Sequence, residues 1–274
     1  MIISGSSSHL LKGNLAKLIS GRYLEIEVFP LNFKEYLNFK DVKVESKLDS
    51  ASKRINIIKC LKEYLKEGGF PRIVIEKDKN LKIEFLKNYY ESIVLKDIIS
   101  NNKIRQERLV KELLHYLASN LSSLYSYKNL SDYLSADYGT IKEYLGIIER
   151  SRIFFELSFF SYSLKSQEKN NKKIYCIDNG IINAISFKFS DNIGKLAENL
   201  VALELKKNNQ EIFYWQNEKN QEIDFIIKDS NENLTAINVT FTDEIEEKEL
   251  MILKEFKEKF NKTDKLLLIT KNKE

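Results

Sequence analysis

The sequence predicts a mixed α/β fold in three parts, and three observations support this prediction. Apolar residues recur at helical spacing through the first two thirds of the chain. Short runs of β-branched and aromatic residues alternate with helical stretches in the last third. The chain has 274 residues, of which 43% are hydrophobic and 31% charged, so it can form several cores and is not a disordered tail.

The first part, residues 1–100, is predicted to be mainly helical. Tyr23–Phe29 alternates apolar and polar side chains, which is typical of a half-buried strand. Gly68-Gly69-Phe70-Pro71 marks a turn between two long helical patterns. The expected helices are Phe33–Phe39, 53–67 and 81–99.

The second part, residues 101–170, is predicted to be a winged helix. Its expected elements are helices near 106–119, 128–135 and 139–150, followed by a hairpin of Ile153–Leu157 and Phe159–Tyr162. Lys142, Arg150 and Arg152 are candidate DNA-binding residues, because cations of this kind contact phosphates. Winged helices also act as protein-binding or spacer modules, and acidic residues on the same helix dilute its charge.

The third part, residues 171–274, is predicted to begin with a strand and to continue in the order α-β-β-β-α-β. The expected strands are Lys173–Ile177, Glu211–Trp215, Glu222–Lys228, Leu234–Val239 and Lys265–Ile269, and the expected helices are Ile193–Asn208 and Ile245–Phe260. This order resembles the core of the restriction-endonuclease-like superfamily. In that superfamily the helix offers a Glu, the second strand an Asp and the third strand an (Asp/Glu)-x-Lys, which together serve Mg²⁺-dependent cleavage.

The resemblance implies a degenerate nuclease-like site in this chain. Glu198 stands on the helix and Asp224 on the second strand, and both are possible Mg²⁺ ligands because carboxylate oxygens suit that ion. Asn238 stands where the second acid is expected, and Thr240 stands where the Lys is expected. Two interpretations stay open: a Mg²⁺-dependent nuclease, or acids kept as structural polar groups. A lysine from elsewhere, such as Lys195 or Lys228, would favour the nuclease.

Several short motifs occur in a fixed order along the whole chain. They are Gly5-Ser6-Ser7-Ser8, Ser20-Gly21-Arg22, Gly68-Gly69-Phe70-Pro71, YESIVLKD at Tyr90–Asp97, YCIDNG at Tyr175–Gly180 and GKLAENLVALE at Gly194–Glu204. This series resembles the C-terminal portion of prokaryotic AAA-type ATPases that end in the restriction-endonuclease-like domain of unknown function 4143. The resemblance implies that residues 1–100 are the C-terminal part of an ATPase domain with a helical lid. It also implies that Ser6 and Ser7 act as nucleotide sensors, and that Arg22 can approach a phosphate.

The chain departs from such ATPases in one respect. The sequence contains no Gly-x-x-x-x-Gly-Lys-Ser/Thr loop, whose amides and Lys cradle nucleotide phosphates. We therefore expect no ATP hydrolysis by this chain alone, and ATP binding only with a chain that supplies the Walker A and B elements. The expected function is that of a DNA- or protein-binding module, as a possible homo-oligomer, with a protein-interaction subunit as an alternative.

Composition excludes several other classes of protein. No apolar run approaches the roughly 18 residues that a transmembrane helix needs, and the first residues do not have the pattern of a signal peptide. We therefore expect a cytoplasmic protein without a membrane partner. Two cysteines and two histidines are too few for a disulfide framework or a multi-histidine metal site.

Overall fold

The computed structural model describes residues 24, 26–186, 193–208, 210–242 and 245–271. The described chain forms two compact units. The first contains the described residues of 1–119, 127–155 and 176–187, and the second those of 120–126, 156–175 and 188–274. The three-part division at residues 100/101 and 170/171 stays a prediction.

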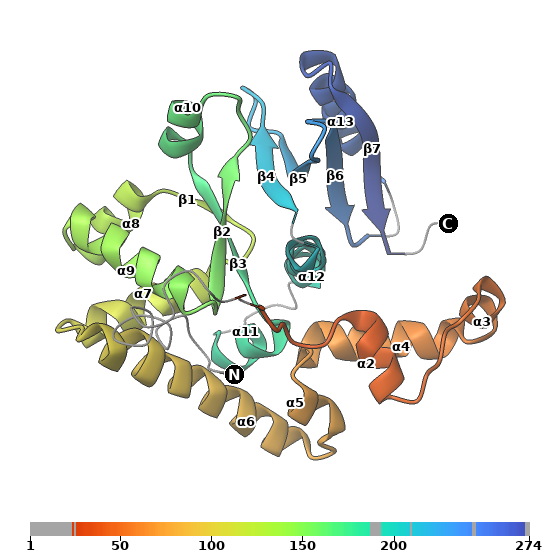
Figure 1. Cartoon of the computed structure of the whole chain (residues 1–274), viewed down its shortest axis with the longest axis horizontal. Coiled ribbons are helices and arrows are strands. Elements are labelled where there is room, and N and C mark those ends of the chain that lie inside the picture. Colours follow the sequence, from red (N-terminus) through yellow and green to blue (C-terminus); the bar gives the residue numbers. More distant parts are fainter. Residues whose placement is uncertain (1–23, 25, 187–192, 209, 243–244, 272–274) are drawn as a thin grey trace. The chain divides into compact units, whose positions relative to one another are not determined.

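The first unit is helical (Figure 1). Its helices are α2 (Phe33–Phe39), α3 (Lys47–Ser52), α4 (Arg54–Glu67), α5 (Pro71–Ile75), α6 (Lys79–Ser92), α7 (Glu107–Ser119), α8 (Tyr127–Leu134), α9 (Tyr138–Arg150) and α11 (Asn179–Ile185). The π-helix η2 (Ile93–Ser100) continues α6 without a break. Local sequence explains several helix starts: the Asn32 side chain accepts a hydrogen bond from Glu35 N at α2, and Asp137 accepts one from Thr140 N at α9.

A hydrogen-bonded joint connects the turn after α4 to the start of α11. Gly68 ends α4 with a φ of 78°, a conformation that favours glycine. The Asp178 carboxylate accepts hydrogen bonds from Gly69 N at 2.6 Å and, with its other oxygen, from Gly180 N at 2.8 Å. Asn183 Nδ2 also donates to Lys66 O at 2.6 Å. These bonds fix helix α11 against α4, and α11 also packs on α6.

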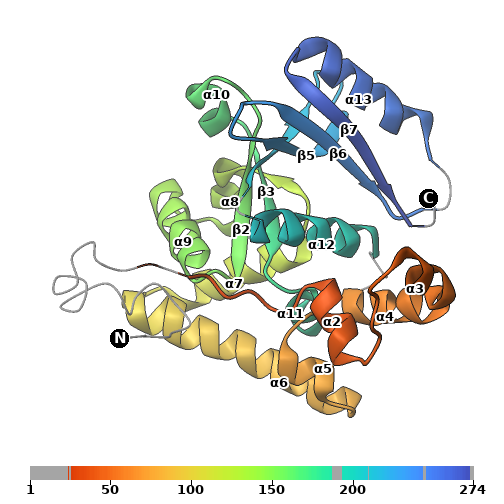
Figure 2. The same ribbon diagram turned by 45° about the vertical axis from the view of Figure 1, so that its right-hand side comes forward.

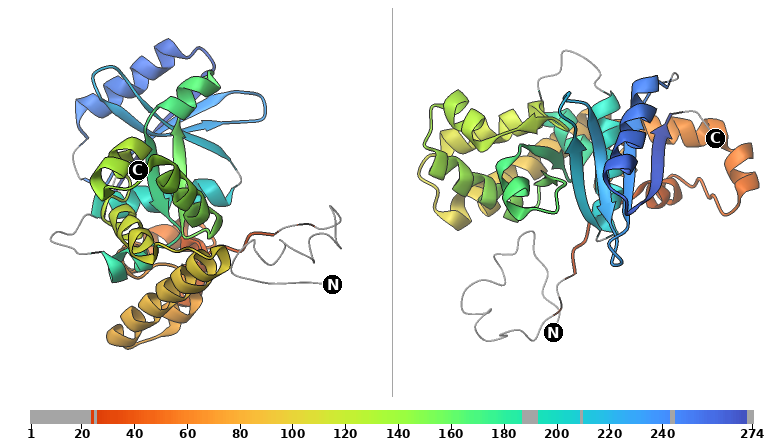
Figure 3. Two further views of the ribbon diagram at one scale, coloured as in Figure 1. Left: turned by 90° about the vertical axis from the view of Figure 1, so that its left-hand side faces the viewer. Right: turned by 90° about the horizontal axis from the view of Figure 1, so that it is seen from above.

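The second unit is built on a sheet of seven described strands (Figures 1 and 3). The strands are β1 (Leu124–Tyr125), β2 (Phe154–Phe159, of which 156–159 belong to this unit), β3 (Lys172–Cys176), β4 (Glu211–Gln216), β5 (Glu222–Lys228), β6 (Leu234–Thr240) and β7 (Thr263–Thr270). Their order in the sheet is β1-β3-β2-β4-β5-β6-β7. The pairs β1–β3, β4–β5 and β5–β6 are antiparallel, and β2–β4 and β6–β7 are parallel.

Three helices accompany this sheet (Figure 2). They are α10 (Leu164–Lys169), α12 (Ile193–Lys207) and α13 (Glu247–Lys259). Helix α12 packs on β4 and β6, and α13 packs on β5, β6 and β7. The core beneath α13 combines aliphatic and aromatic side chains, and in it the rings of Trp215 and Phe256 lie 5.2 Å apart, edge to face.

The mixed α/β class and the helix and strand order of 193–270 are confirmed, but two local predictions are wrong. Leu24 and 26–29 form no strand; Leu24, Ile26 and Val28 are 86%, 75% and 87% exposed, so no neighbouring strand covers them in the described chain. The expected hairpin over 153–162 is the single strand β2, whose neighbours are β3 and β4. None of the described helices has the length and apolar character that crossing a membrane requires.

Candidate functional site

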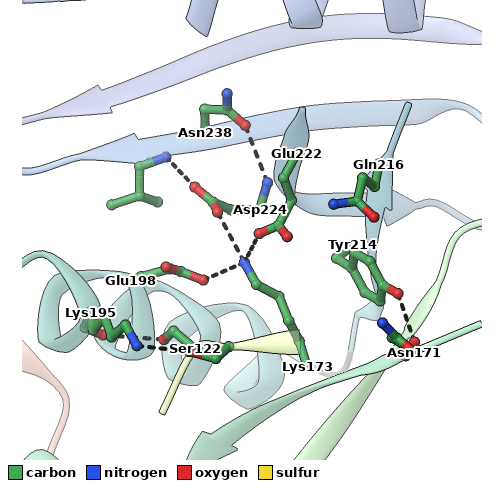
Figure 4. A network of polar contacts seen from close by, with 12 residues as sticks. Ser122, Asn171, Lys173, Lys195, Glu198, Tyr214, Gln216, Glu222, Asp224 and Asn238 are labelled. Carbon is green, nitrogen blue, oxygen red and sulfur yellow. Dashed lines mark hydrogen bonds and ion pairs between the residues drawn. The ribbon is translucent and has the colours of Figure 1, made fainter. Parts of the chain in front are cut away.

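A buried lysine lies among three carboxylates in the second unit (Figure 4). Lys173 Nζ on β3 donates to Glu198 Oε1 on α12 at 2.7 Å and to Asp224 Oδ1 on β5 at 3.1 Å. It also forms an ion pair with Glu222 on β5. We call Lys173, Glu198, Glu222 and Asp224 the lysine–acid cluster. The sheet and α12 together supply its four side chains.

The lysine is far less exposed than its partners. Only 2% of the Lys173 side chain is exposed, against 13% for Glu198, 17% for Asp224 and 25% for Glu222. Tyr175, two residues along β3, donates its hydroxyl to Glu198 Oε1 at 2.7 Å. Glu198 Oε1 therefore accepts two hydrogen bonds. The buried ammonium of Lys173 has carboxylate partners, which offset the free-energy cost of removing its charge from water.

Asp224 and Asn238 are held by a second set of bonds. The other carboxylate oxygen of Asp224 accepts from Val239 N at 2.9 Å, and Asn238 Oδ1 accepts from Asp224 N at 3.2 Å. Asn238 Nδ2 donates to Glu249 Oε2 on α13 at 2.6 Å. Both ends of the Asn238 amide are thus engaged within the protein.

The cluster shifts the pKa of its members. Burial lowers the pKa of the Lys173 ammonium, but Tyr175 and the three carboxylates outweigh that effect and raise it well above its usual range. Burial, and then the neighbouring Asp224 charge, raise the pKa of Glu198 to about 7 against the opposing effect of Lys173. Burial also raises the pKa of Glu222. The lysine stays charged, and the acids partly share its single positive charge.

The two lysines that would favour a nuclease if they reached this site, Lys195 and Lys228, bond elsewhere. Lys195 Nζ donates to Ser123 Oγ at 2.7 Å, and burial lowers the pKa of its ammonium. Lys228 forms an ion pair with Glu232 at 3.9 Å. The lysine whose ammonium bonds to Glu198 and Asp224 is Lys173.

The Mg²⁺ that a restriction-endonuclease-like fold implies does not fit these residues as they lie. The point on which the carboxylates converge is taken by Lys173 Nζ, and the Asn238 oxygen already accepts a backbone hydrogen bond. No group of three or more acidic, histidine or cysteine side chains is placed to hold a metal ion in the described ranges. The arrangement is chemically that of an acidic cluster bonded to an internal cation.

The other candidate residues lie outside this cluster. Lys142 and Arg150 are exposed on α9, and their neighbours Glu143 and Glu149 are exposed as well. Arg152 forms an ion pair with Glu27 at 2.5 Å. Ser6, Ser7 and Arg22 lie outside the described residues.

The sequence patterns did not identify Lys173, Tyr175 or Glu222 as site residues. The available signals were a lysine at the start of an otherwise apolar strand and an acid two residues before Asp224 on the same strand. Neither signal identifies a partner, because Lys173 is 25 residues from Glu198 and 51 from Asp224 along the chain.

Family comparisons agree with the motif series. An AAA domain model matches residues 1–37, a domain of unknown function (DUF8612) matches 58–192, and a domain of unknown function (DUF4143) matches 193–274. The resemblance recognised in the sequence is confirmed. The matches place an AAA domain model at residues 1–37 and a DUF4143 model at the C-terminal end, as the motif series predicts.

Curated relatives extend beyond the matched region. An uncharacterised protein of Methanocaldococcus jannaschii is 35% identical over 260 residues, which cover 91% of this chain and 57% of the relative. An uncharacterised protein of Haemophilus influenzae is 32% identical over 277 residues, covering 99% of this chain and 63% of the relative. The chain thus spans less than two thirds of either relative. No solved structure matches the chain significantly.

Proposed function

We propose that this chain is a non-catalytic binding module of an AAA-type ATPase system, with a nuclease-like second unit that serves as a scaffold. The observation that carries this proposal is the ammonium of Lys173 bonded to Glu198 and Asp224. The acids that would hold a catalytic metal are here occupied with an internal cation. They stabilise the unit rather than supply chemistry.

The competing proposal is a Mg²⁺-dependent nuclease using Glu198, Asp224 and Asn238. Metal-assisted phosphodiester cleavage requires hard oxygen ligands open to the ion and a group that activates water. Lys173 occupies the carboxylates, Asn238 is tied to Glu249, and Thr240 carries no ammonium. A nuclease would therefore require Lys173 to withdraw from a position in which its side chain is only 2% exposed.

The resemblance to AAA-type ATPases supports a role in sensing bound ATP rather than in hydrolysing it. The printed sequence contains no phosphate-binding loop. In this proposal ATP binds only with Walker A and B elements from outside these 274 residues. Ser6, Ser7 and Arg22 then sense its phosphates.

DNA is a second candidate ligand, and α9 is the specific reason to consider it. Lys142 and Arg150 are exposed on this helix, as phosphate contact requires. Arg152 is less suited to contact a DNA phosphate, because its charge is paired with Glu27. The exposed Glu143 and Glu149 weaken the positive potential of the helix, so we place protein scaffolding ahead of DNA binding.

Metal titration combined with a cleavage assay tests the proposal. The purified chain is titrated with Mg²⁺ and Mn²⁺ by calorimetry and incubated with supercoiled plasmid in each ion, beside an Asp224→Ala variant. We expect no binding heat and no cleavage from either protein. Cleavage by the parent that disappears in Asp224→Ala would establish a nuclease and overturn the scaffold proposal.

A further inference from the structure

We infer that the ammonium of Lys173 is a built-in cation that prevents divalent metals from binding to the lysine–acid cluster. Removing this ammonium should allow the three carboxylates of the cluster to bind a divalent ion. The inference rests on the proposed scaffold function and extends it. It assigns to one residue the exclusion of metal that the scaffold proposal expects.

The geometry of the ammonium supports this assignment. A lysine has three N–H donors, and Lys173 has three carboxylate partners, one each from Glu198, Glu222 and Asp224. These acids come from α12 and from two alternate positions of β5, and they converge on one atom. Three carboxylates on a common point are the kind of ligand set that hard divalent cations prefer.

Charge and burial explain why the native cluster stays closed. The ammonium enters on a side chain that is 2% exposed, so it is fixed within the protein rather than exchanged with solvent. Its partners are 13–25% exposed, so an ion from solvent would reach the carboxylates first. Such an ion would have to displace a tethered cation, whose effective concentration at the site is very high.

The opposite role for Lys173, as a relocated catalytic lysine beside a metal, makes a different prediction. A catalytic lysine leaves the parent able to bind metal, and its loss abolishes activity without creating affinity. A built-in cation leaves the parent unable to bind metal, and its loss creates affinity. The sign of the change in metal binding therefore separates the two roles.

Calorimetric titration with Mn²⁺ alone provides the test, using the full chain, Lys173→Met and the matched control Lys172→Met. Lys172 is the preceding residue, and its ammonium donates instead to Gln167 O at 2.7 Å and Ser158 Oγ at 3.1 Å. We expect Lys173→Met to bind Mn²⁺ at least about tenfold more tightly than the parent or the control. Adding Asp224→Ala to Lys173→Met should remove this binding.

A further variant allows for poor folding of Lys173→Met, which leaves three carboxylates without their cation. Combining Lys173→Met with Glu222→Gln removes one of those charges and keeps Glu198 and Asp224 as ligands. Thermal unfolding of either variant should shift upward with Mn²⁺ but not with the same concentration of NaCl. A folded variant without Mn²⁺ affinity overturns the inference and leaves the scaffold proposal intact. Parent binding that depends on Asp224 overturns both.

Discussion

The carboxylate of Asp178 accepts a hydrogen bond from Gly69 N at 2.6 Å, across 109 residues of chain. Two of the motifs that mark this family in the sequence, Gly68-Gly69-Phe70-Pro71 and YCIDNG, therefore meet in one joint. Their role in the described structure is to hold α11 against α4.

Gly68→Ala should destabilise the first unit by about 2–4 kcal/mol. The φ of 78° strains any residue with a Cβ, and a Cβ built at this position lies 2.0 Å from Asp178 Oδ1. Urea unfolding followed by circular dichroism measures the loss. Gly194→Ala is the matched control, because in the described chain no atom beyond its own helix and chain neighbours lies within 4 Å of its added Cβ, and alanine favours the helix. Equal stability of the two variants would contradict the joint.

Lys173→Met should lower the free energy of unfolding at neutral pH by about 3–5 kcal/mol, because it leaves buried carboxylates without their cation. The loss should shrink at low pH, where Glu198 and Glu222 take up protons and need no partner. Chemical unfolding at both pH values measures the difference. Lys172→Met keeps the lysine–acid cluster complete and should lower the free energy of unfolding by less. A similar loss in both variants would show that the cluster does not stabilise the protein.

Glu198 should make stability fall as pH rises from about 4.5 to about 7. Its pKa is raised in the folded protein from 4.5 to about 7, so the folded state binds more protons than the unfolded state in this window. Since a tenfold change in proton affinity is worth ~1.4 kcal/mol, the decline should be roughly 1–3 kcal/mol. Unfolding at a series of pH values tests this. Glu198→Gln should flatten the profile, and an unchanged slope would contradict the prediction.

Asn238→Asp, which restores the acid that nucleases have at this position, should destabilise the protein above pH 6 by about 1–3 kcal/mol. The new carboxylate would face Glu249, which now accepts from Asn238 Nδ2 at 2.6 Å. Adding Glu249→Gln supplies an amide donor again and should recover most of the loss. Failure of this second change to rescue stability would show that the Asn238–Glu249 contact is not the cause.

Lys142→Glu combined with Arg150→Glu should weaken binding of a fluorescent DNA duplex if α9 contacts phosphate. The slope of log affinity against log salt should become shallower by about 2, because each lost phosphate contact releases roughly one counterion fewer. Lys59→Glu combined with Lys62→Glu, on the exposed face of α4, makes the same charge change elsewhere. If both double variants weaken DNA binding equally, the attraction is nonspecific and α9 is not the DNA-binding surface.

Periodic patterns predicted much of the fold. Helix Phe33–Phe39 and strand Glu222–Lys228 occur at the expected residues, because one face of each carries a regular apolar pattern that packing then buries. Prediction failed where tertiary contacts decide the outcome. Leu24, Ile26 and Val28 alternate like a strand, yet no described strand pairs with them.

The candidate site was predictable only in part. Glu198 and Asp224 followed from a family pattern, and they do converge. Lys173 did not, because a buried lysine within an apolar strand gives no indication of which distant acids neutralise it. Likewise, the sequence shows Asn238 in place of an acid, but not that Glu249 on α13 takes its amide.

The way the chain passes repeatedly between the two units limits how the protein can be divided. The DUF4143 match begins at residue 193, but the second unit also contains 120–126 and 156–175, which carry β1 and most of β2 and β3. A fragment of 193–274 would lack three of the seven strands and would keep Glu198, Glu222 and Asp224 while losing Lys173. During synthesis, the acids emerge from the ribosome after the lysine that neutralises them. The counter-charge is therefore in place before the cluster can form, and a fragment cut at the family boundary would have to find a cation elsewhere.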